Sequence, residues 1–218
     1  FLLDDLRRPL ARSPADVGIA GFEDVVLEPG DQKIAIRGWW FPVARPKGVF
    51  VLLHGGGDNR ASPFTGLLEL VRDLRDRGYA SLAIDLRGHG ESDAAAGGTT
   101  FGPTEANDVI AAVDFVARRA PGVPVAALGF SMGGSAAIYA AVKEPRVDAV
   151  ITVSTYADLA AVLPRAVAAS SGIPALLLYP VLWSAETLHG VPVSWANAVD
   201  VTPRLDPGAL LVVHVERD

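Results

Sequence analysis

One serine in the sequence has neighbours that suit a nucleophile. Residues 123–134 read VPVAALGFSMGG, in which Ser131 lies between Gly129 and Gly133. A serine with glycine two residues before and after it can occupy a sharp, strained turn, because no side chain crowds the bend. Its hydroxyl would then be exposed for attack on a carbonyl carbon. In a chain with 22 glycines the pattern could also arise by chance, as a helix start capped by Ser131, so its context decides.

A glycine triplet supplies a second part of such chemistry. Gly55, Gly56 and Gly57 follow the apolar run 49–53. Acyl transfer needs backbone N–H donors that face the developing oxyanion, each worth about 3 to 4 kcal/mol of barrier. We predict that the N–H groups of Gly56 and Met132 are these donors. The triplet lacks the spacing of a phosphate-binding loop or of a dinucleotide fingerprint, which disfavours a nucleotide site.

A serine nucleophile also needs a general base and an acid that orients it. Asp218 follows the last apolar run and is the predicted acid, whereas Asp158 is better interpreted as the N-cap of a helix. His89 lies between two glycines in a turn-like stretch, DLRGHGES, and is predicted to be structural. His189 and His214 both precede Asp218, against the expected order of serine, acid, histidine. The sequence therefore assigns no base.

The apolar runs predict the elements that must position these residues. Continuous apolar runs are typical of parallel strands buried on both faces, and the segments between them have helical spacing. Strands are expected at 49–53, 80–84, 123–128, 149–153 and 210–215, and helices at 64–77, 104–119, 135–143 and 158–169. The fold class is α/β, a doubly wound, mostly parallel sheet preceded by an antiparallel hairpin of 22–27 and 33–43. Ligands bind such sheets at the carboxyl ends of the strands, where Gly56 and Ser131 lie.

The length of 218 residues fits a single domain, 1–218. Residues 1–21 are expected to form an arm on its surface. Residues 155–207 form a long insert before the last strand, and we expect it to include an apolar cap over the serine. Its large apolar residues include Tyr156, Leu163, Tyr179, Leu182, Trp183 and Trp195. Such a cap would favour an acyl or aromatic ester.

Composition excludes several classes of function. The formal net charge is −6 and there is no basic block, so we expect neither nucleic acid nor an anionic membrane surface as a partner. With no cysteine, disulfides and thiolate sites are excluded, and we expect no metal or organic cofactor. The longest apolar tract is broken by Gly172, Pro174 and Pro180, so no membrane segment is expected. The compartment stays open, with the cytoplasm slightly favoured, because an anchor or signal upstream of Phe1 cannot be judged.

Together the motifs resemble the α/β-hydrolase superfamily, in particular its serine-aminopeptidase-like and acyl-hydrolase (esterase) branch. The pieces are HGGGDNR, DLRGHGES, GFSMGG, PRVDAVITVS and LLVVHVERD, in family order. The resemblance implies Ser131 as nucleophile, Asp218 as acid and an oxyanion hole at Gly56 and Met132. It also implies hydrolysis of a carboxylic ester or related small acyl substrate through an acyl-enzyme, with peptidase, thioesterase or perhydrolase chemistry as alternatives.

The sequence departs from that family at its end. The family continues with a helix, a final strand and a catalytic histidine, so we expect this chain to be truncated before them. The missing histidine favours one alternative of another class, a non-catalytic binding or scaffold domain. A bare last strand also invites pairing, so we expect its edge to be covered by a second copy, as a homo-oligomer, or by the N-terminal arm.

Overall fold

The protein forms a seven-stranded sheet. The computed structural model describes residues 7–172, 174, 176–177, 179–180, 196–206 and 208–214. Its strands are β1 (Glu23–Leu27), β2 (Ile36–Phe41), β3 (Val49–Leu53), β4 (Ala80–Ile84), β5 (Val125–Phe130), β6 (Ala149–Val153) and β7 (Leu210–Val213). Their order across the sheet is β1-β2-β4-β3-β5-β6-β7. β1 and β2 form the predicted antiparallel hairpin. In the remaining sheet order β4-β3-β5-β6-β7, each strand is parallel to its neighbours.

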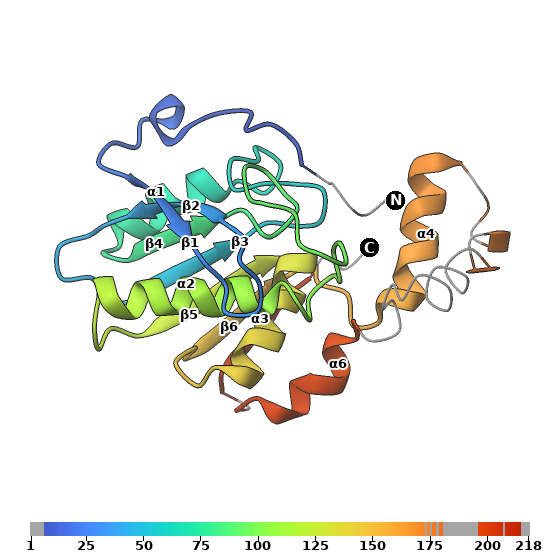
Figure 1. Ribbon diagram of the computed structural model, residues 1–218. Helices are drawn as coiled ribbons and strands as arrows, with labels where there is room; N and C mark the ends of the chain where they lie inside the picture. Colours follow the sequence, from blue (N-terminus) through green and yellow to red (C-terminus); the bar gives the residue numbers. More distant parts are fainter. Residues whose placement is uncertain are drawn as a thin grey trace.

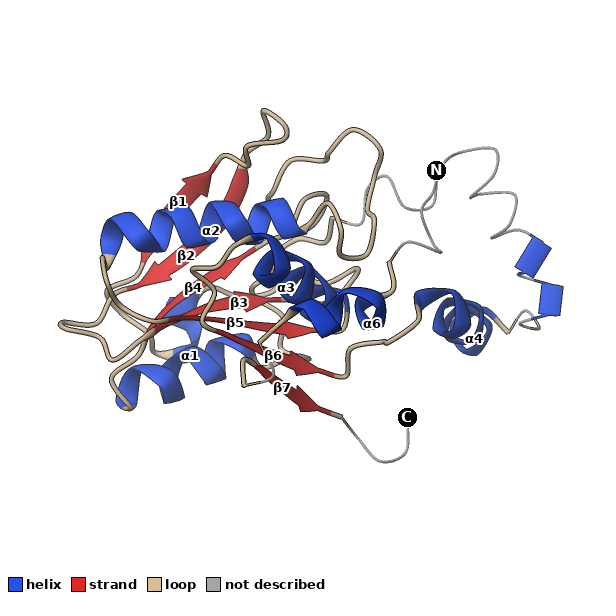
Figure 2. Cartoon of the chain, turned by 90° about the horizontal axis from the view of Figure 1, so that it is seen from below, coloured by secondary structure: helices blue, strands red, loops and turns tan. Residues whose placement is uncertain are grey.

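Helices cover both faces of the sheet. They are α1 (Leu67–Asp76), α2 (Ala106–Arg119), α3 (Met132–Lys143), α4 (Leu159–Ser171) and α6 (Ala198–Val201), with 3₁₀ turns η1 (Pro14–Val17) and η2 (Thr202–Arg204). α2 and α3 pack on one face and α1 on the other, each over its own apolar cluster (Figures 1 and 2). The predicted doubly wound, mostly parallel α/β sheet is confirmed.

The chain reverses its direction across the sheet at β3. β4 pairs on one side of β3, and the chain then crosses back to place β5 on the other side. Leu53 pairs with Gly129 at the end of this β3–β5 ladder. Because both strands end together, the glycine triplet and Ser131 leave the sheet side by side. This is the switch point at which open α/β sheets bind ligands.

The junction of β5 and α3 differs from the sequence expectation. β5 ends at Phe130 rather than residue 128, and α3 begins at Met132 rather than residue 135. Gly129 pairs with Thr152 of β6, so that glycine does not end the strand. Gly133 belongs to the first turn of α3, where it packs directly on Leu53 and the His54 carbonyl oxygen. Ser131 therefore connects strand and helix with no intervening loop.

The N-terminal arm lies against α1 and the loop that follows the triplet. Arg12 forms a two-pronged ion pair with Glu69 of α1, at 2.5 and 2.8 Å, and donates to the carbonyl oxygens of Ala61 and Ser62. η1 packs beside the same helix, and Ile19 is buried in the apolar cluster that includes Leu67 and Val71 of α1. Residues 7–21 of the arm thus pack on α1 and on the loop after the triplet.

The edge strand β7 is not covered by that arm. Leu211, Val212 and Val213 are 56%, 59% and 45% exposed. The expectation that the arm shields this edge is wrong for residues 7–21, because the Arg12–Glu69 ion pair holds them at α1. The alternative, a homo-oligomer through β7, stays a prediction.

The described part of the 155–207 insert includes α4, α6 and η2. Asp158 accepts a hydrogen bond from the Ala161 N–H at 3.1 Å, which confirms it as the N-cap of α4. α4 lies apart from the sheet, beyond the ends of β3 and β5 (Figure 1). Neither it nor any other helix in the described ranges is long and apolar enough to cross a membrane.

Candidate active site

Ser131 occupies a strained turn. Its backbone has φ 48° and ψ −114°, a region that residues with a side chain rarely adopt. The turn is fixed from both sides: the Ser131 N–H donates to the Val153 carbonyl oxygen at 2.9 Å, and the Thr155 hydroxyl donates to the Ser131 carbonyl oxygen at 3.1 Å. The Ser131 side chain makes no capping hydrogen bond to α3, which disfavours the chance interpretation as a helix cap. Strain held in this way is typical of functional turns.

Two glycines allow the turn to close. A Cβ on Gly133 would lie 2.5 Å from the His54 carbonyl oxygen and 2.8 Å from the Leu53 Cβ. A Cβ on Gly129 would overlap the carbonyl group of Gly133. Both positions therefore need glycine for space, and α3 can begin directly behind the serine.

The predicted oxyanion donors lie beside this serine. A Cβ on Gly55 would be 3.5 Å from the Ser131 Cβ, and one on Gly56 would be 4.0 Å from the Met132 Cβ. Met132 is the first residue of α3, so its N–H has no acceptor within the helix. The structure thus brings Gly56, Met132 and Ser131 together. Their roles in binding an oxyanion stay predictions.

A cavity of about 830 Å³ opens over these residues. Its lining combines the triplet and Ser131 with the loop 58–65, Phe130, the end of β6 and the N-terminal arm. The lining residues are Arg8, Pro9, Ala11, Gly55, Gly56, Gly57, Asp58, Asn59, Ser62, Pro63, Phe64, Thr65, Phe130, Ser131, Val153 and Ser154. A cavity of this size accommodates a small organic substrate.

The arm and the insert contribute to the site differently from the sequence expectation. Arg8, Pro9 and Ala11 line the cavity, and no sequence signal pointed to them. Of the insert residues within the described ranges, none lines it. Tyr156 instead donates to the Phe101 carbonyl oxygen, and Tyr179 is exposed. Leu182, Trp183 and Trp195 lie outside the described residues, so the cap stays a prediction.

His54 anchors the triplet from beneath. Its Nδ1–H donates to the Gly55 carbonyl oxygen at 2.7 Å, and the Leu86 N–H donates to its Nε2 at 3.0 Å. These partners assign the neutral tautomer. The ring is fully buried, and this burial lowers the pKa of His54 to about 4. His54 therefore ties the loop after β3 to the loop after β4 as a neutral group.

This burial predicts a loss of stability in acid. The unfolded chain takes up a proton at His54 near pH 6.5, and the folded protein only near pH 4. The free energy of unfolding is therefore highest above pH 6.5 and decreases as the pH falls from 6.5 to 4. For one such histidine, the free energy of unfolding decreases by about 3 kcal/mol between pH 6.5 and pH 4. Denaturant unfolding of wild type and His54→Gln from pH 7 to 4 measures it. The difference in unfolding free energy between the two should shrink in acid; parallel curves would contradict the assignment.

His89 is a second buried histidine. Its ring lies 5.1 Å from that of His54, its Nδ1 hydrogen-bonds to the Arg87 carbonyl oxygen at 2.9 Å, and burial lowers its pKa to about 4. It holds the turn after β4, which agrees with the structural interpretation. His214 follows β7 and is exposed. None of the histidines within the described ranges lines the Ser131 cavity.

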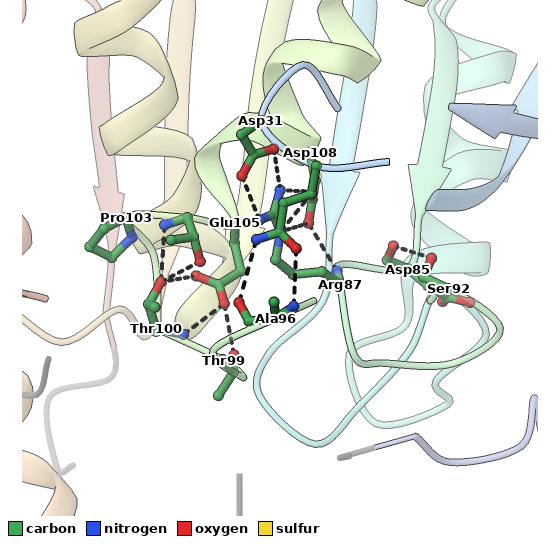
Figure 3. Close-up of polar contacts among 12 residues, drawn as sticks. Asp31, Asp85, Arg87, Ser92, Ala96, Thr99, Thr100, Pro103, Glu105 and Asp108 are labelled. Carbon is green, nitrogen blue, oxygen red and sulfur yellow. Dashed lines mark hydrogen bonds and ion pairs between the residues drawn. The ribbon is translucent and has the colours of Figure 1, made fainter. Parts of the chain in front are cut away.

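The turn after β4 is built on charged side chains (Figure 3). The Asp85 carboxylate accepts from the N–H groups of Arg60 and Glu91, at 2.7 and 2.8 Å, and pairs with the buried Arg60 guanidinium. The Ser92 hydroxyl donates to the Asp85 carbonyl oxygen at 2.7 Å. Arg87 pairs with Asp108 of α2 and with Asp31. Asp85, Arg87 and Ser92 thus all supply side-chain hydrogen bonds or ion pairs that hold this turn.

A buried glutamate organises the loop 99–102 (Figure 3). The Glu105 carboxylate accepts from the Thr99 and Thr100 hydroxyls and from the N–H groups of Thr100 and Gly102, at 2.8 to 2.9 Å. The loop carries Phe101, whose ring would lie 3.6 Å from a Cβ on Gly56. The sequence predicted no role for Glu105, the N-cap residue of α2, or for Asp108 in the first turn of that helix; the available signal was two carboxylates at the start of an otherwise apolar helix face.

The predicted acid lies beyond this description. Asp218 is outside the described residues, as is His189. Their placement relative to Ser131 stays a prediction.

Curated relatives match about half of the chain. Human monoglyceride lipase is 33% identical over 107 residues, which cover 49% of this chain and 34% of that protein. The human protein ABHD12B is 32% identical over 129 residues, or 55% of this chain and 33% of that protein. The match thus spans about a third of the length of these relatives.

Solved structures share the fold over most of the chain. An esterase from Pyrococcus furiosus superposes with a TM-score of 0.72 at 23% identity, covering 96% of this chain and 75% of that one. An acetyl xylan esterase from Paenibacillus gives a TM-score of 0.63 at 24% identity, covering 88% and 67%. At these identities the likeness establishes the α/β-hydrolase fold.

A sequence profile described as serine aminopeptidase, S33, matches residues 44–198. The matched range contains the glycine triplet, the turn after β4 and the Ser131 junction. We conclude that the chain belongs to the S33 serine aminopeptidase family of α/β hydrolases.

Proposed function

We propose that this protein is a serine hydrolase that cleaves a carboxylic ester through an acyl-enzyme on Ser131. The observation that carries the proposal is the strained serine at the β3–β5 switch point, beside two candidate N–H donors and a cavity. The monoglyceride lipase and esterases among the similar proteins support an ester over a peptide or a thioester. Which ester is cleaved is inferred from the residues that line the cavity.

The reaction follows from this arrangement. The Ser131 hydroxyl oxygen attacks the ester carbonyl carbon, and the N–H groups of Gly56 and Met132 stabilise the oxyanion. The alcohol leaves with a proton, and water then hydrolyses the acyl-enzyme to the carboxylic acid. A histidine oriented by Asp218 is the expected proton acceptor. The N–H donors belong to the triplet and to α3, both fixed by packing, so they need little rearrangement to act.

A fluorophosphonate probe tests the nucleophile directly. It modifies only an activated serine, and we expect stoichiometric modification of Ser131, located by peptide mass spectrometry. A heat-denatured sample is the control for nonspecific labelling. The experiment uses both the 218-residue chain and the longest product of its gene. If neither is labelled and neither hydrolyses p-nitrophenyl esters, the non-catalytic scaffold alternative is correct instead.

A further inference from the structure

One cation faces the cavity over Ser131. Arg8 is the only positively charged residue among the described lining residues, and its side chain is exposed. A Cβ on Gly57 would lie 3.7 Å from Arg8 Nη2, so the guanidinium sits against the last glycine of the triplet. Among the residues that the structure describes, no carboxylate lies within ion-pair distance of it. The donors of Arg8 are therefore not paired with any carboxylate of the described residues.

The arm is fixed where it carries this cation. The Asn59 side-chain amide donates to the carbonyl oxygens of Arg8 and Pro9, at 3.2 and 3.3 Å. Four residues further on, Arg12 is clamped to Glu69 and the backbone of the same loop. Two anchors on one loop hold the arm as part of the cavity wall.

The other charged residue of the lining is already engaged. Asp58 accepts from the Asn59 N–H through its Oδ1 at 2.9 Å. Its carboxylate thus holds the backbone of Asn59, and the Asn59 side chain holds the arm. The remaining lining is neutral and mostly apolar, so it offers room for a hydrocarbon chain between Ser131 and Arg8.

We propose that Arg8 selects esters whose acyl chain ends in a carboxylate. This proposal rests on the proposed hydrolase function. A guanidinium offers a planar set of donors that matches a carboxylate, and such charge-assisted hydrogen bonds are the stronger ones. The acyl carbonyl would lie at Gly56 and Met132, the chain along the triplet, and the terminal carboxylate at Arg8. Arg8 is thus a specificity-determining residue, and the substrate class is a half-ester of a dicarboxylic acid.

The triplet sets the length of that acyl chain. Gly55 lies beside Ser131 and Gly57 beside Arg8. The Asp58 N–H donates to the Gly55 carbonyl oxygen, so the triplet turns and spans less than the roughly 7 Å of two extended residues. A dicarboxylic chain of about six carbons spans a comparable length. The matched probes are therefore mono-p-nitrophenyl adipate and p-nitrophenyl hexanoate, which differ only in a terminal carboxylate or methyl group.

Substitution of Arg8 tests the proposal with these two esters. Arg8→Gln should lower kcat/KM for the adipate half-ester by about 5- to 20-fold and change that for hexanoate by less than about two-fold. Arg8→Lys should retain part of the preference, and Arg8→Glu should reverse it. Arg7→Gln is the matched control, because it removes the same charge from the neighbouring position outside the lining. The wild-type preference should also weaken with added NaCl.

Equal effects of Arg8→Gln on both esters, or none, would overturn the proposal while leaving the hydrolase function intact. Binding of adipate and hexanoate to Ser131→Ala, measured by calorimetry, separates the two questions. If neither ester is hydrolysed but adipate binds more tightly in an Arg8-dependent way, the proposed function fails and the anion site stands.

Discussion

Ser131→Ala is expected to lower kcat/KM for p-nitrophenyl butyrate by at least about 10⁴-fold, because loss of the nucleophile of a serine hydrolase has effects of this size. The substitution removes the attacking oxygen and leaves the backbone turn, which is held by the Val153 carbonyl oxygen and the Thr155 hydroxyl. Steady-state kinetics with a pre-steady-state burst assay measure it. The burst of p-nitrophenol should disappear together with turnover.

Ser154→Ala is the matched control for that loss. Ser154 also has φ 48° and lines the same cavity, but it follows β6 rather than preceding a helix. Its N–H donates to the Val213 carbonyl oxygen, and this bond does not involve the side chain. We expect Ser154→Ala to retain activity within about ten-fold. An active Ser131→Ala, or equal losses in both variants, would exclude Ser131 as the nucleophile.

Gly133→Ala is expected to destabilise the protein by more than about 3 kcal/mol. In an exposed helix the same change gains up to about 1 kcal/mol of helix propensity, so the sign depends on space. Here the new Cβ would lie 2.5 Å from the His54 carbonyl oxygen and 2.8 Å from both the Leu53 Cβ and carbonyl oxygen. Backbone of β3 cannot move aside without breaking its ladder with β5. The clash therefore dominates.

Gly30→Ala provides the comparison for that substitution. Gly30 has an ordinary φ, and a Cβ there would meet nothing within 4 Å. We expect its unfolding free energy to change by less than about 1 kcal/mol. Urea unfolding of the two variants and wild type measures both. Stability of Gly133→Ala within 1 kcal/mol of wild type would show that α3 does not pack on β3 as described.

The order and type of the elements could be predicted because each buried parallel strand is one continuous apolar run. β3, β4 and β6 begin and end at the predicted residues. The bounds of the β5–α3 junction could not be predicted, because Gly129 and Gly133 are spaced like residues of a loop. Their actual role, close packing of α3 on β3 and β5, depends on tertiary contacts.

The candidate site could be predicted only where it is local in sequence. Ser131, Gly56 and Met132 each follow a strand, so the fold class places them together. Arg8 reaches the cavity through Asn59, a contact across about 50 positions that no periodicity signals. The four hydrogen bonds of Glu105 likewise form only when the loop 99–102 folds around its carboxylate, so the sequence does not indicate them.

The pairing of Leu53 with Gly129 joins segments separated by 76 positions, with β4, α1 and α2 between them. Contacts of such high order close large loops, which are costly in entropy, and they form late in folding. The strand–turn–helix unit around Ser131 can arise locally, but it faces the triplet only after this ladder is complete. The geometry of the candidate site therefore depends on the whole assembled sheet, and grafting the short motif into another protein would not reproduce it.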